Sequence, residues 1–517
     1  MSIARAYADK DTWITEASVT SNFGQSPILE VWNKINDITK RKEFARMLVS
    51  FSLSSLSADI VNNGNIPDPR TNTSVSAFIN LKNAENSQTQ AINFDLVAYP
   101  LTATFMEGRG LDNDDYTNTG FANAVSATNT IPWTSSNGQT GAAGYIGAAS
   151  RVYDSNSATQ FFESGQEDLR LDVTDYFKSY LNFSTGTSIA DGGSADHGFI
   201  IRMTDKYEAK DKPEALSAGV AASVSAESFY TKKFYSRETN TRKRPYFELV
   251  WDGAIKDNRN NIKFSKTADL FYYSIVDGEL TDLNNRGPFP GHVTISANGV
   301  GMLTSAASGM ALTASRFSKG IYKVNIGTAT NAAGYLNLTG INLALSSSTS
   351  FTDSWTITTA GEYRTDTFSF TCLLPTSGRA SYNTSDYSST PIVSLANLQG
   401  QYSPRTKARI RVFVKNRQTQ WEAITGSTTA MNSTIVKDGS FEIRELVTDD
   451  IEVPEQELSY DADGNFFDLD NRLLYDGIKY KIVIKLNVRG ENIVYDYPER
   501  WQFACGDTYD IDYTAGY

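Results

Sequence analysis

Short stretches of aromatic and β-branched residues, each bounded by turn-forming residues, recur along most of the chain and constrain its fold more than any other feature. In the clearest of them, residues 234–252, an alternating stretch turns through residues 240–244 and returns as an aromatic run. The chain holds 27 Tyr, 27 Phe and 7 Trp, side chains that suit half-buried pleated strands, whereas long helical stretches are scarce. The sequence therefore predicts an all-β protein, with one short helix within residues 169–181.

Chain length and two polar stretches predict three domains. A chain of 517 residues exceeds what one hydrophobic core usually serves. Residues 252–261 form a polar linker with almost nothing to bury, and residues 376–391 are a Ser/Thr-rich connection. We expect a β-sandwich over residues 1–253, an immunoglobulin-like sandwich with regularly spaced strands over 262–375, and a C-terminal β domain over 394–517.

The C-terminal domain carries two local patterns. Residues 479–488 largely alternate with period two, so in an antiparallel sheet Lys479, Lys481 and Lys485 would face solvent. Residues 461–470 begin like an EF-hand loop but lack its central glycine and its final glutamate. We therefore expect a tight Asp-Gly turn between two strands there.

Charge and hydropathy argue against nucleic acids and membranes as partners. The formal net charge is −12, whereas non-specific nucleic-acid binding depends on a basic face that neutralises phosphates. The stretch 1–10 lacks the apolar segment of a secretory signal. No apolar stretch approaches the roughly 20 residues that span a bilayer. We expect neither a nucleic acid nor a membrane as a partner.

Residues suited to catalysis are scarce. The only histidines, His197 and His292, fall in different predicted domains, as do the only cysteines, Cys372 and Cys505. A nucleophile–histidine–acid arrangement or a zinc site would need such residues side by side, and no phosphate-binding or dinucleotide-binding glycine motif is present. We expect no enzymatic activity, no cofactor and no disulfide framework.

A long irregular segment between residues 107 and 150 holds the best candidates for ligand binding. Arg109, Asp112, Tyr116 and Trp133 lie within it, and sugar sites combine aromatic platforms with such polar groups. We favour the interpretation that the aromatic residues anchor the loop to its own core. The alternatives are a carbohydrate site formed by these four residues and, less favoured still, a hydrolytic pair made by Glu107 and Asp112.

The same segment contains an oxygen-rich cluster, in which Asp112, Asp114 and Asp115 are the candidate metal ligands. Calcium prefers such carboxylate oxygens. We favour a solvated acidic loop, with a structural calcium ion as the alternative.

About half of the chain resembles a known family. The segments that carry the resemblance include an "EGRGLD" loop and a "YSRET" strand, and they are residues 6–14, 22–32, 46–56, 105–112, 131–133, 171–177 and 234–252. In this order they resemble the DNRLRE-type β-sandwich, a jelly-roll module related to carbohydrate-binding modules. Variants with these two motifs are similar to modules in structural proteins of tailed bacteriophages.

The resemblance implies a jelly roll for residues 1–253 and a structural role in a virion, at the head, neck or tail. The implied partners are other virion proteins, such as portal, neck, capsid or tail components, with the chain present in multiple copies. Its mechanism would be docking of one surface against those proteins. The alternative is an adhesin that binds host-surface polysaccharide through the first domain.

Overall fold

The computed structural model shows a multidomain, all-β protein, which confirms the predicted fold class. The residues that the structure describes are 2–35, 42–85, 91–101, 103–111, 121–128, 133, 157–186, 195–204, 207, 230–239, 241–259, 262–263, 267–297, 300–301, 304–305, 308–309, 312–326, 348–359, 362–373, 391–415, 435–488 and 490–506.

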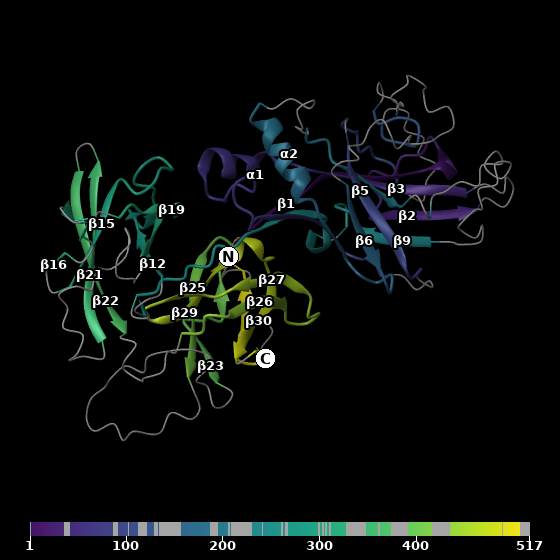
Figure 1. Cartoon of the computed structure of the whole chain (residues 1–517). Coiled ribbons are helices and arrows are strands. Elements are labelled where there is room, and N and C mark those ends of the chain that lie inside the picture. The colour runs from purple at the N-terminus through teal and green to yellow at the C-terminus, as the bar shows by residue number, and fades with distance from the viewer. Residues whose placement is uncertain are drawn as a thin grey trace, which may run out of the picture. The chain divides into compact units, whose positions relative to one another are not determined.

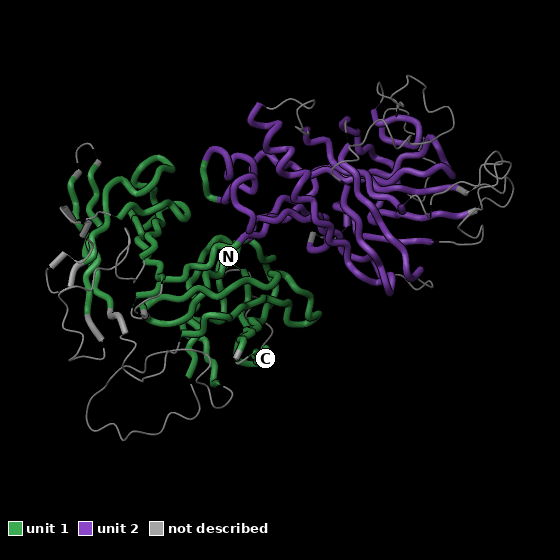
Figure 2. Tube along the Cα trace, viewed as in Figure 1, with its two compact units in different colours: residues 1–2, 63–65, 252–517 green, residues 3–62, 66–251 purple. Residues whose placement is uncertain are grey.

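The chain forms two compact units (Figure 2). Unit 2 comprises residues 3–62 and 66–251, and unit 1 comprises residues 1–2, 63–65 and 252–517. The sheets of unit 1 come from two regions of sequence, one ending at Leu373 and the other starting at Ile392. The boundaries of the three domains that we expect from the sequence stay a prediction.

The described residues of unit 2 form strands, two α-helices and a few shorter helical turns (Figure 1). The strands and α-helices are β1 (Ile3–Thr15), β2 (Ile28–Ile35), β3 (Lys42–Phe51), α1 (Ser54–Ala58), β4 (Ser76–Leu81), β5 (Phe94–Pro100), β6 (Ala158–Phe162), β7 (Leu169–Asp172), α2 (Thr174–Ser184), β8 (Phe199–Met203), β9 (Tyr230–Tyr235) and β10 (Tyr246–Val250).

All the strand pairs described in unit 2 are antiparallel. They form two sheets, which β1 joins into one ten-stranded sheet because each half of it pairs in a different one. Its first half pairs with β10 in the order β1-β10-β4-β7. Its second half pairs with β3, which continues through β8 and β5 to β6 and also pairs with β2, followed by β9. The register shifts between Ala8 and Lys10, and such a bulge bends a strand so that it can serve both sheets.

One hydrophobic core lies between these sheets. Phe51 on β3 contacts Phe247 on β10, with ring centroids 5.9 Å apart, and Phe177 on α2 lies 5.3 Å from the same ring. The predicted helix begins only at Thr174, because residues 169–172 form β7 beside β4. Its apolar face is buried as the spacing indicated, since Tyr176, Phe177, Tyr180 and Leu181 all belong to the core.

Unit 1 contains short sheets from two sequence regions. The first region holds β11 (Ile262–Lys263), β12 (Ala268–Tyr273), β13 (Ile275–Val276), β14 (Glu279–Leu280), β15 (Gly291–Ala297), β16 (Val300–Gly301), β17 (Thr304–Ser305), β18 (Ser308–Gly309), β19 (Ser315–Ser318), β20 (Ile321–Ile326), β21 (Ser348–Thr359) and β22 (Glu362–Leu373). The second holds β23 (Ile392–Ala396), β24 (Gln401–Tyr402), β25 (Lys407–Lys415), β26 (Gly439–Glu445), β27 (Ile451–Glu457), β28 (Ser459–Asp461), β29 (Gly464–Asp470), β30 (Ile478–Val488), β31 (Glu491–Asp496) and β32 (Gln502–Cys505).

Each region has its own pair of main sheets. In the first, β11-β22-β21-β15-β16 faces β12-β20-β19 across a core centred on Trp355, which stacks on Tyr272 at 5.2 Å and meets Phe289 edge-on at 5.2 Å. In the second, the sheets are β23-β25-β29-β28 and β24-β32-β30-β26-β27, with β31 beside β30.

The stretch 252–261 was predicted to be a linker with little to bury, and that prediction is wrong for its described part. Ile255 is buried, and its backbone pairs with Tyr460 on β28. Arg259 is 9% exposed and binds Asp257 and Asp353, the latter with Nη2 2.6 Å from Oδ2. Burial, the largest cause, raises the pKa of Asp257 to about 6. The charge of the buried Arg259 is therefore compensated by two carboxylates, and the stretch contacts both regions of unit 1.

The C-terminal region confirms one local prediction and corrects the other in part. The turn between β28 and β29 pairs Asp461 with Gly464, as expected. Lys479 is exposed, but Lys481 and Lys485 are half-buried. Lys481 Nζ binds two aspartates at 2.8 Å, and Lys485 Nζ binds two glutamates at 2.8–2.9 Å. Acidic side chains from β26, β27, β31 and the turn between β26 and β27 thus pair with lysines that alternation alone places in solvent.

Candidate functional site

Two sequence motifs that lie far apart in the chain, residues 22–32 and 105–112, meet around Asn22 in unit 2. The buried Asn22 amide donates from Nδ2 to the carbonyl oxygens of Glu107 and Ala122, at 2.7 and 2.8 Å. Its Oδ1 accepts the backbone N–H groups of Gly24 and Gly110, at 3.2 and 2.9 Å. These four hydrogen bonds use the full capacity of the amide, so the loop that begins at Glu107 is fixed to the segment after β1.

The glycines of the "EGRGLD" loop are required by this close approach. A Cβ atom on Gly110 would lie 1.7 Å from the carbonyl oxygen of Asn22. Gly108 has a φ of +91°, and a Cβ there would lie 2.1 Å from Asn22 Oδ1. Only glycine fits a backbone in this conformation at such distances, and Arg109 between the two glycines is exposed.

A charged cluster lies on the other side of the same loop. Glu107 Oε1 accepts the N–H of Asp11 at 2.9 Å and lies 3.4 Å from Nε of Arg237, in the "YSRET" motif. The N–H of Arg237 donates to Asp11 Oδ2 at 2.7 Å. Asp11 is 1% exposed, and burial, the largest cause, raises its pKa to about 8. Burial also raises the pKa of Glu107.

This cluster has the character of a structural junction. An Asp11 carboxyl with a pKa near 8 is mostly protonated at neutral pH. Glu107 is held by a backbone N–H and a guanidinium, so its carboxylate is already occupied. Asp112, its partner in the hydrolytic alternative, lies outside the described residues.

Trp133 is not a platform for a sugar, because its side chain is only 2% exposed. Its indole Nε1 donates to the carbonyl oxygen of Asn123 at 2.8 Å, and its backbone N–H donates to Val125 at 3.0 Å. It packs in a second core on the outer face of the β3 sheet, together with Ile14, Leu48, Leu101, Phe105, Ala122, Ala127 and Ile200. The favoured interpretation, an anchor for the loop, is confirmed for Trp133.

Of the remaining residues in the predicted carbohydrate and metal sites, only Arg109 lies in the described part of the chain. Arg109 is exposed, as a ligand-binding residue would be. Tyr116, Asp112, Asp114 and Asp115 lie outside the described residues, and the calcium and carbohydrate alternatives at these positions stay predictions. Among the residues that the structure describes, no group of three or more His, Cys, Asp or Glu side chains is arranged to hold a metal ion.

We call residues 103–111 and 121–128, with Trp133 beneath them, the loop platform. Met106 exchanges backbone hydrogen bonds with Ala127 and Ala122, at 2.9 and 2.8 Å. Three apolar side chains nevertheless face solvent on it: Met106 is 40% exposed, Leu111 37% and Val125 44%. This surface was not predicted from the sequence, although the Gly-Arg-Gly spacing in the loop was a signal of tight backbone packing.

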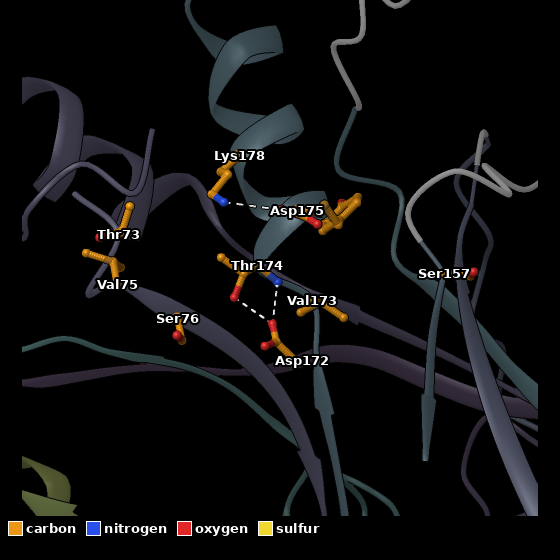
Figure 3. A pocket seen from close by; sticks show the side chains of 10 residues that line it. Thr73, Val75, Ser76, Ser157, Asp172, Val173, Thr174, Asp175 and Lys178 are labelled. Atoms are coloured by element: carbon orange, nitrogen blue, oxygen red, sulfur yellow. Dashed lines mark hydrogen bonds and ion pairs between the residues drawn. The ribbon is translucent and has the colours of Figure 1, made fainter. Parts of the chain in front are cut away.

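A polar cavity of about 350 Å³ lies at the start of α2 (Figure 3). Asp172 accepts hydrogen bonds from the N–H and hydroxyl of Thr174, at 2.9 and 2.6 Å. Lys178 Nζ binds Asp175 at 3.2 Å (Figure 3). The charged groups at this cavity therefore serve the first turn of the helix. The sequence analysis gave no ligand role to them.

Comparisons with known proteins identify no relatives that bear on function. No family model matches the sequence, and no curated protein matches it. Among solved structures, the chain is similar to a DUF4785 family protein from Legionella pneumophila, with 8% identity over 97% of this chain and 88% of that chain, at a TM-score of 0.15. It is also similar to E. coli alpha-2-macroglobulin, with 9% identity over 91% of this chain and 20% of that chain, at a TM-score of 0.15.

Among the described helices, none is long and apolar enough to cross a membrane.

Proposed function

We propose that this chain is a structural component of a tailed-bacteriophage virion and that it docks on other virion proteins through the loop platform. The observation that carries the proposal is the combination of rigidity and apolar exposure on that surface. Asn22 and Trp133 fix the loop from below, while Met106, Leu111 and Val125 expose apolar surface.

A preorganised apolar surface favours association with another protein. Ordering flexible side chains and loops on binding costs free energy, and a surface that is already hydrogen-bonded avoids most of that cost. Protein interfaces typically combine an apolar centre with a polar rim, and here the exposed Arg109 lies between Met106 and Leu111 in sequence. The resemblance to the virion modules supports the choice of partner.

The adhesin alternative has less support than the docking proposal. Sugar recognition needs an aromatic face that solvent can reach, and Trp133 is buried against its own sheet. Tyr116 lies outside the described residues. The polysaccharide alternative therefore depends on residues other than Trp133.

The test is incorporation of the chain into particles of the phage that encodes it. Immunoblots of purified particles would compare the wild type with a triple variant, Met106→Ser, Leu111→Ser and Val125→Ser. We expect the triple variant to fold and to be lost from the particles. Tyr363→Ser is the matched control, because Tyr363 is 80% exposed in unit 1.

Two results would overturn the proposal. One is the absence of the wild-type chain from purified particles. The other is normal incorporation of the triple variant. A glycan array with the full chain separates the alternative, since saturable binding to host polysaccharide without particle incorporation would favour the adhesin.

A further inference from the structure

Lys232 on β9 is a buried amine that three oxygens surround. The residue is 2% exposed. Its Nζ donates to Asn83 Oδ1 at 2.6 Å and to the carbonyl oxygens of Gly165 and Glu167, each at 2.8 Å. The shortest of these contacts is the one to a side-chain amide, which is a group that an amine can attack.

The apolar surroundings of Lys232 make the neutral, nucleophilic amine easier to form than at an exposed lysine, although three oxygens accept hydrogen bonds from the ammonium. Nζ lies 5.1 Å from the ring centroid of Phe162 and 4.9 Å from that of Phe234, and both rings are fully buried. Burial, the largest cause, lowers the pKa of Lys232 to about 8, although the carboxylates of Glu167 and Asp168 oppose the shift. Roughly a tenth of such amines are neutral at pH 7, and a desolvated lysine of this kind is an activated nucleophile.

The backbone holds the Asn83 amide in place beside this amine. Asn83 forms a β-bridge with Phe234, and its N–H donates to Asp168 Oδ1 at 2.7 Å. The next residue, Ala84, donates to the carbonyl oxygen of Lys233 at 3.0 Å. The carbonyl carbon of the amide is one bond from the oxygen that Nζ contacts. Holding two reacting groups at such a distance can replace much of the activation barrier of a reaction between free molecules.

We propose that Lys232 and Asn83 react to form an intramolecular isopeptide bond. The bond between Nζ of Lys232 and Cγ of Asn83 forms, the Cγ–Nδ2 bond breaks, and Nδ2 leaves as ammonia. No atom is oxidised or reduced, so the reaction needs no external reagent. The product is a secondary amide that keeps the carbonyl oxygen of Asn83.

We assign the proton transfer to Glu167, because its carboxylate is near enough to Lys232 to oppose the lowering of the pKa of that amine. Its carbonyl oxygen already accepts a hydrogen bond from Nζ. Its Oε2 is buried and has no hydrogen-bond partner among the described residues. Asp168 is less suited, because its two oxygens bind the N–H of Asn83 and Nζ of Lys82. Glu167 takes a proton from the attacking amine and delivers it to the departing Nδ2.

The bond would join two parts of the sandwich that are distant in sequence. Asn83 follows β4 of one sheet and Lys232 lies in β9 of the other, 149 positions further along the chain. A covalent link over so long a segment restricts the unfolded chain strongly. It would protect unit 2 against unfolding by force, heat or denaturant.

The test is the intact mass of the full chain, combined with mapping of its proteolytic peptides. We expect the wild type to be lighter than its sequence by one ammonia molecule and to yield a branched peptide joining Asn83 to Lys232. Lys232→Arg keeps the charge but removes the nucleophile, so it should show the full sequence mass. Asn83→Ala should also show the full mass.

Two further variants separate chemistry from structure. Lys233→Arg is the matched control, since Lys233 is on the same strand but is paired with Glu30 at 2.8 Å, and it should retain the mass deficit. Glu167→Gln should leave most of the chain unlinked while it remains folded. Complete linkage in Glu167→Gln would refute the role of Glu167.

The proposal as a whole is overturned if the folded wild type, incubated at pH 9, has its full sequence mass and only linear peptides at Lys232. Lys232 would then be a hydrogen-bonded ammonium that holds the 163–167 turn. A mass deficit that persists in Lys232→Arg would overturn it as well, because the ammonia would then come from another asparagine.

Discussion

Replacing Asp11 by Asn should make unit 2 more stable at alkaline pH and should remove much of its pH dependence. In the folded chain Asp11 is 1% exposed, its Oδ1 has no hydrogen-bond partner among the described residues, and its pKa is raised to about 8, chiefly by burial. The folded state therefore holds a proton that the unfolded state releases near pH 4. Between these two pH values the unfolded state binds fewer protons, so the free energy of unfolding falls as pH rises.

The size of the effect follows from the same values. One proton gives a slope of about 1.4 kcal/mol per pH unit. Over the interval from the ordinary value of 3.8 to about 8, the total reaches at most roughly 6 kcal/mol. The neutral Asn side chain mimics the protonated acid and avoids this loss. The advantage of Asp11→Asn should be absent at pH 4, grow with pH, and level off above pH 8.

The measurement is urea unfolding of the full chain at several pH values, followed in unit 2 by pulsed hydrogen exchange of β1 peptides. Asp175→Asn is the matched control, since the Asp175 side chain is 84% exposed and its replacement should give nearly the same small difference at every pH. A constant difference between Asp11→Asn and the wild type from pH 5 to 9 would refute the reasoning. It would mean that Arg237 stabilises the ionised Asp11 enough to cancel the cost of burial.

Three further predictions concern other parts of the fold. Trp133→Ala should cost unit 2 about 3–5 kcal/mol and should expose the 103–111 segment to proteolysis, whereas unchanged stability in urea would show that Trp133 does not anchor the loop. Lys481→Met should cost at most about 1 kcal/mol at low salt and less at 1 M NaCl. The hydrogen bond from Lys481 is the first cause that lowers the pKa of Asp449. The cost should therefore begin to decline as pH falls below about 4 and should vanish only below the lowered pKa of Asp449, and a cost that persists in still stronger acid would contradict the ion-pair explanation. Asp353→Ala should destabilise unit 1 by roughly 3–5 kcal/mol, because it leaves the buried Arg259 with one carboxylate fewer; calorimetry of the full chain would measure it, and a loss below 1 kcal/mol would show that Asp257 alone satisfies Arg259.

Some elements follow directly from local patterns in the sequence. The run 246–251 was expected to be a strand, and residues 246–250 form β10. A short helix was expected within residues 169–181, and α2 forms from Thr174 with Tyr176, Phe177, Tyr180 and Leu181 buried. These predictions succeed because alternation and helical spacing are local properties, and the side that is apolar turns toward the core whatever the partner is.

Other features depend on which segments meet in space. The composition of residues 252–261 predicted a linker. In the structure, Arg259 is buried and forms ion pairs with two carboxylates, one of them on β21. The alternation of residues predicted that Lys481 faces solvent, yet it pairs with Asp449 in a turn and Asp496 on β31 and is half-buried. A polar side chain can be buried when its charge is compensated, and compensation is a property of neighbours that a single sequence does not display.

By itself, the sequence determined that this protein is all-β and multidomain. It also contained the recognisable motifs whose residues form the junction described above. Only the tertiary structure decided that the motifs around Asn22, Glu107 and Arg237 form one junction, that Trp133 is buried, and that Lys232 contacts Asn83 across 149 positions. The physical reason is that strand formation follows from a periodicity of two residues, whereas burial, pKa and reactivity depend on distances between atoms that folding alone brings together.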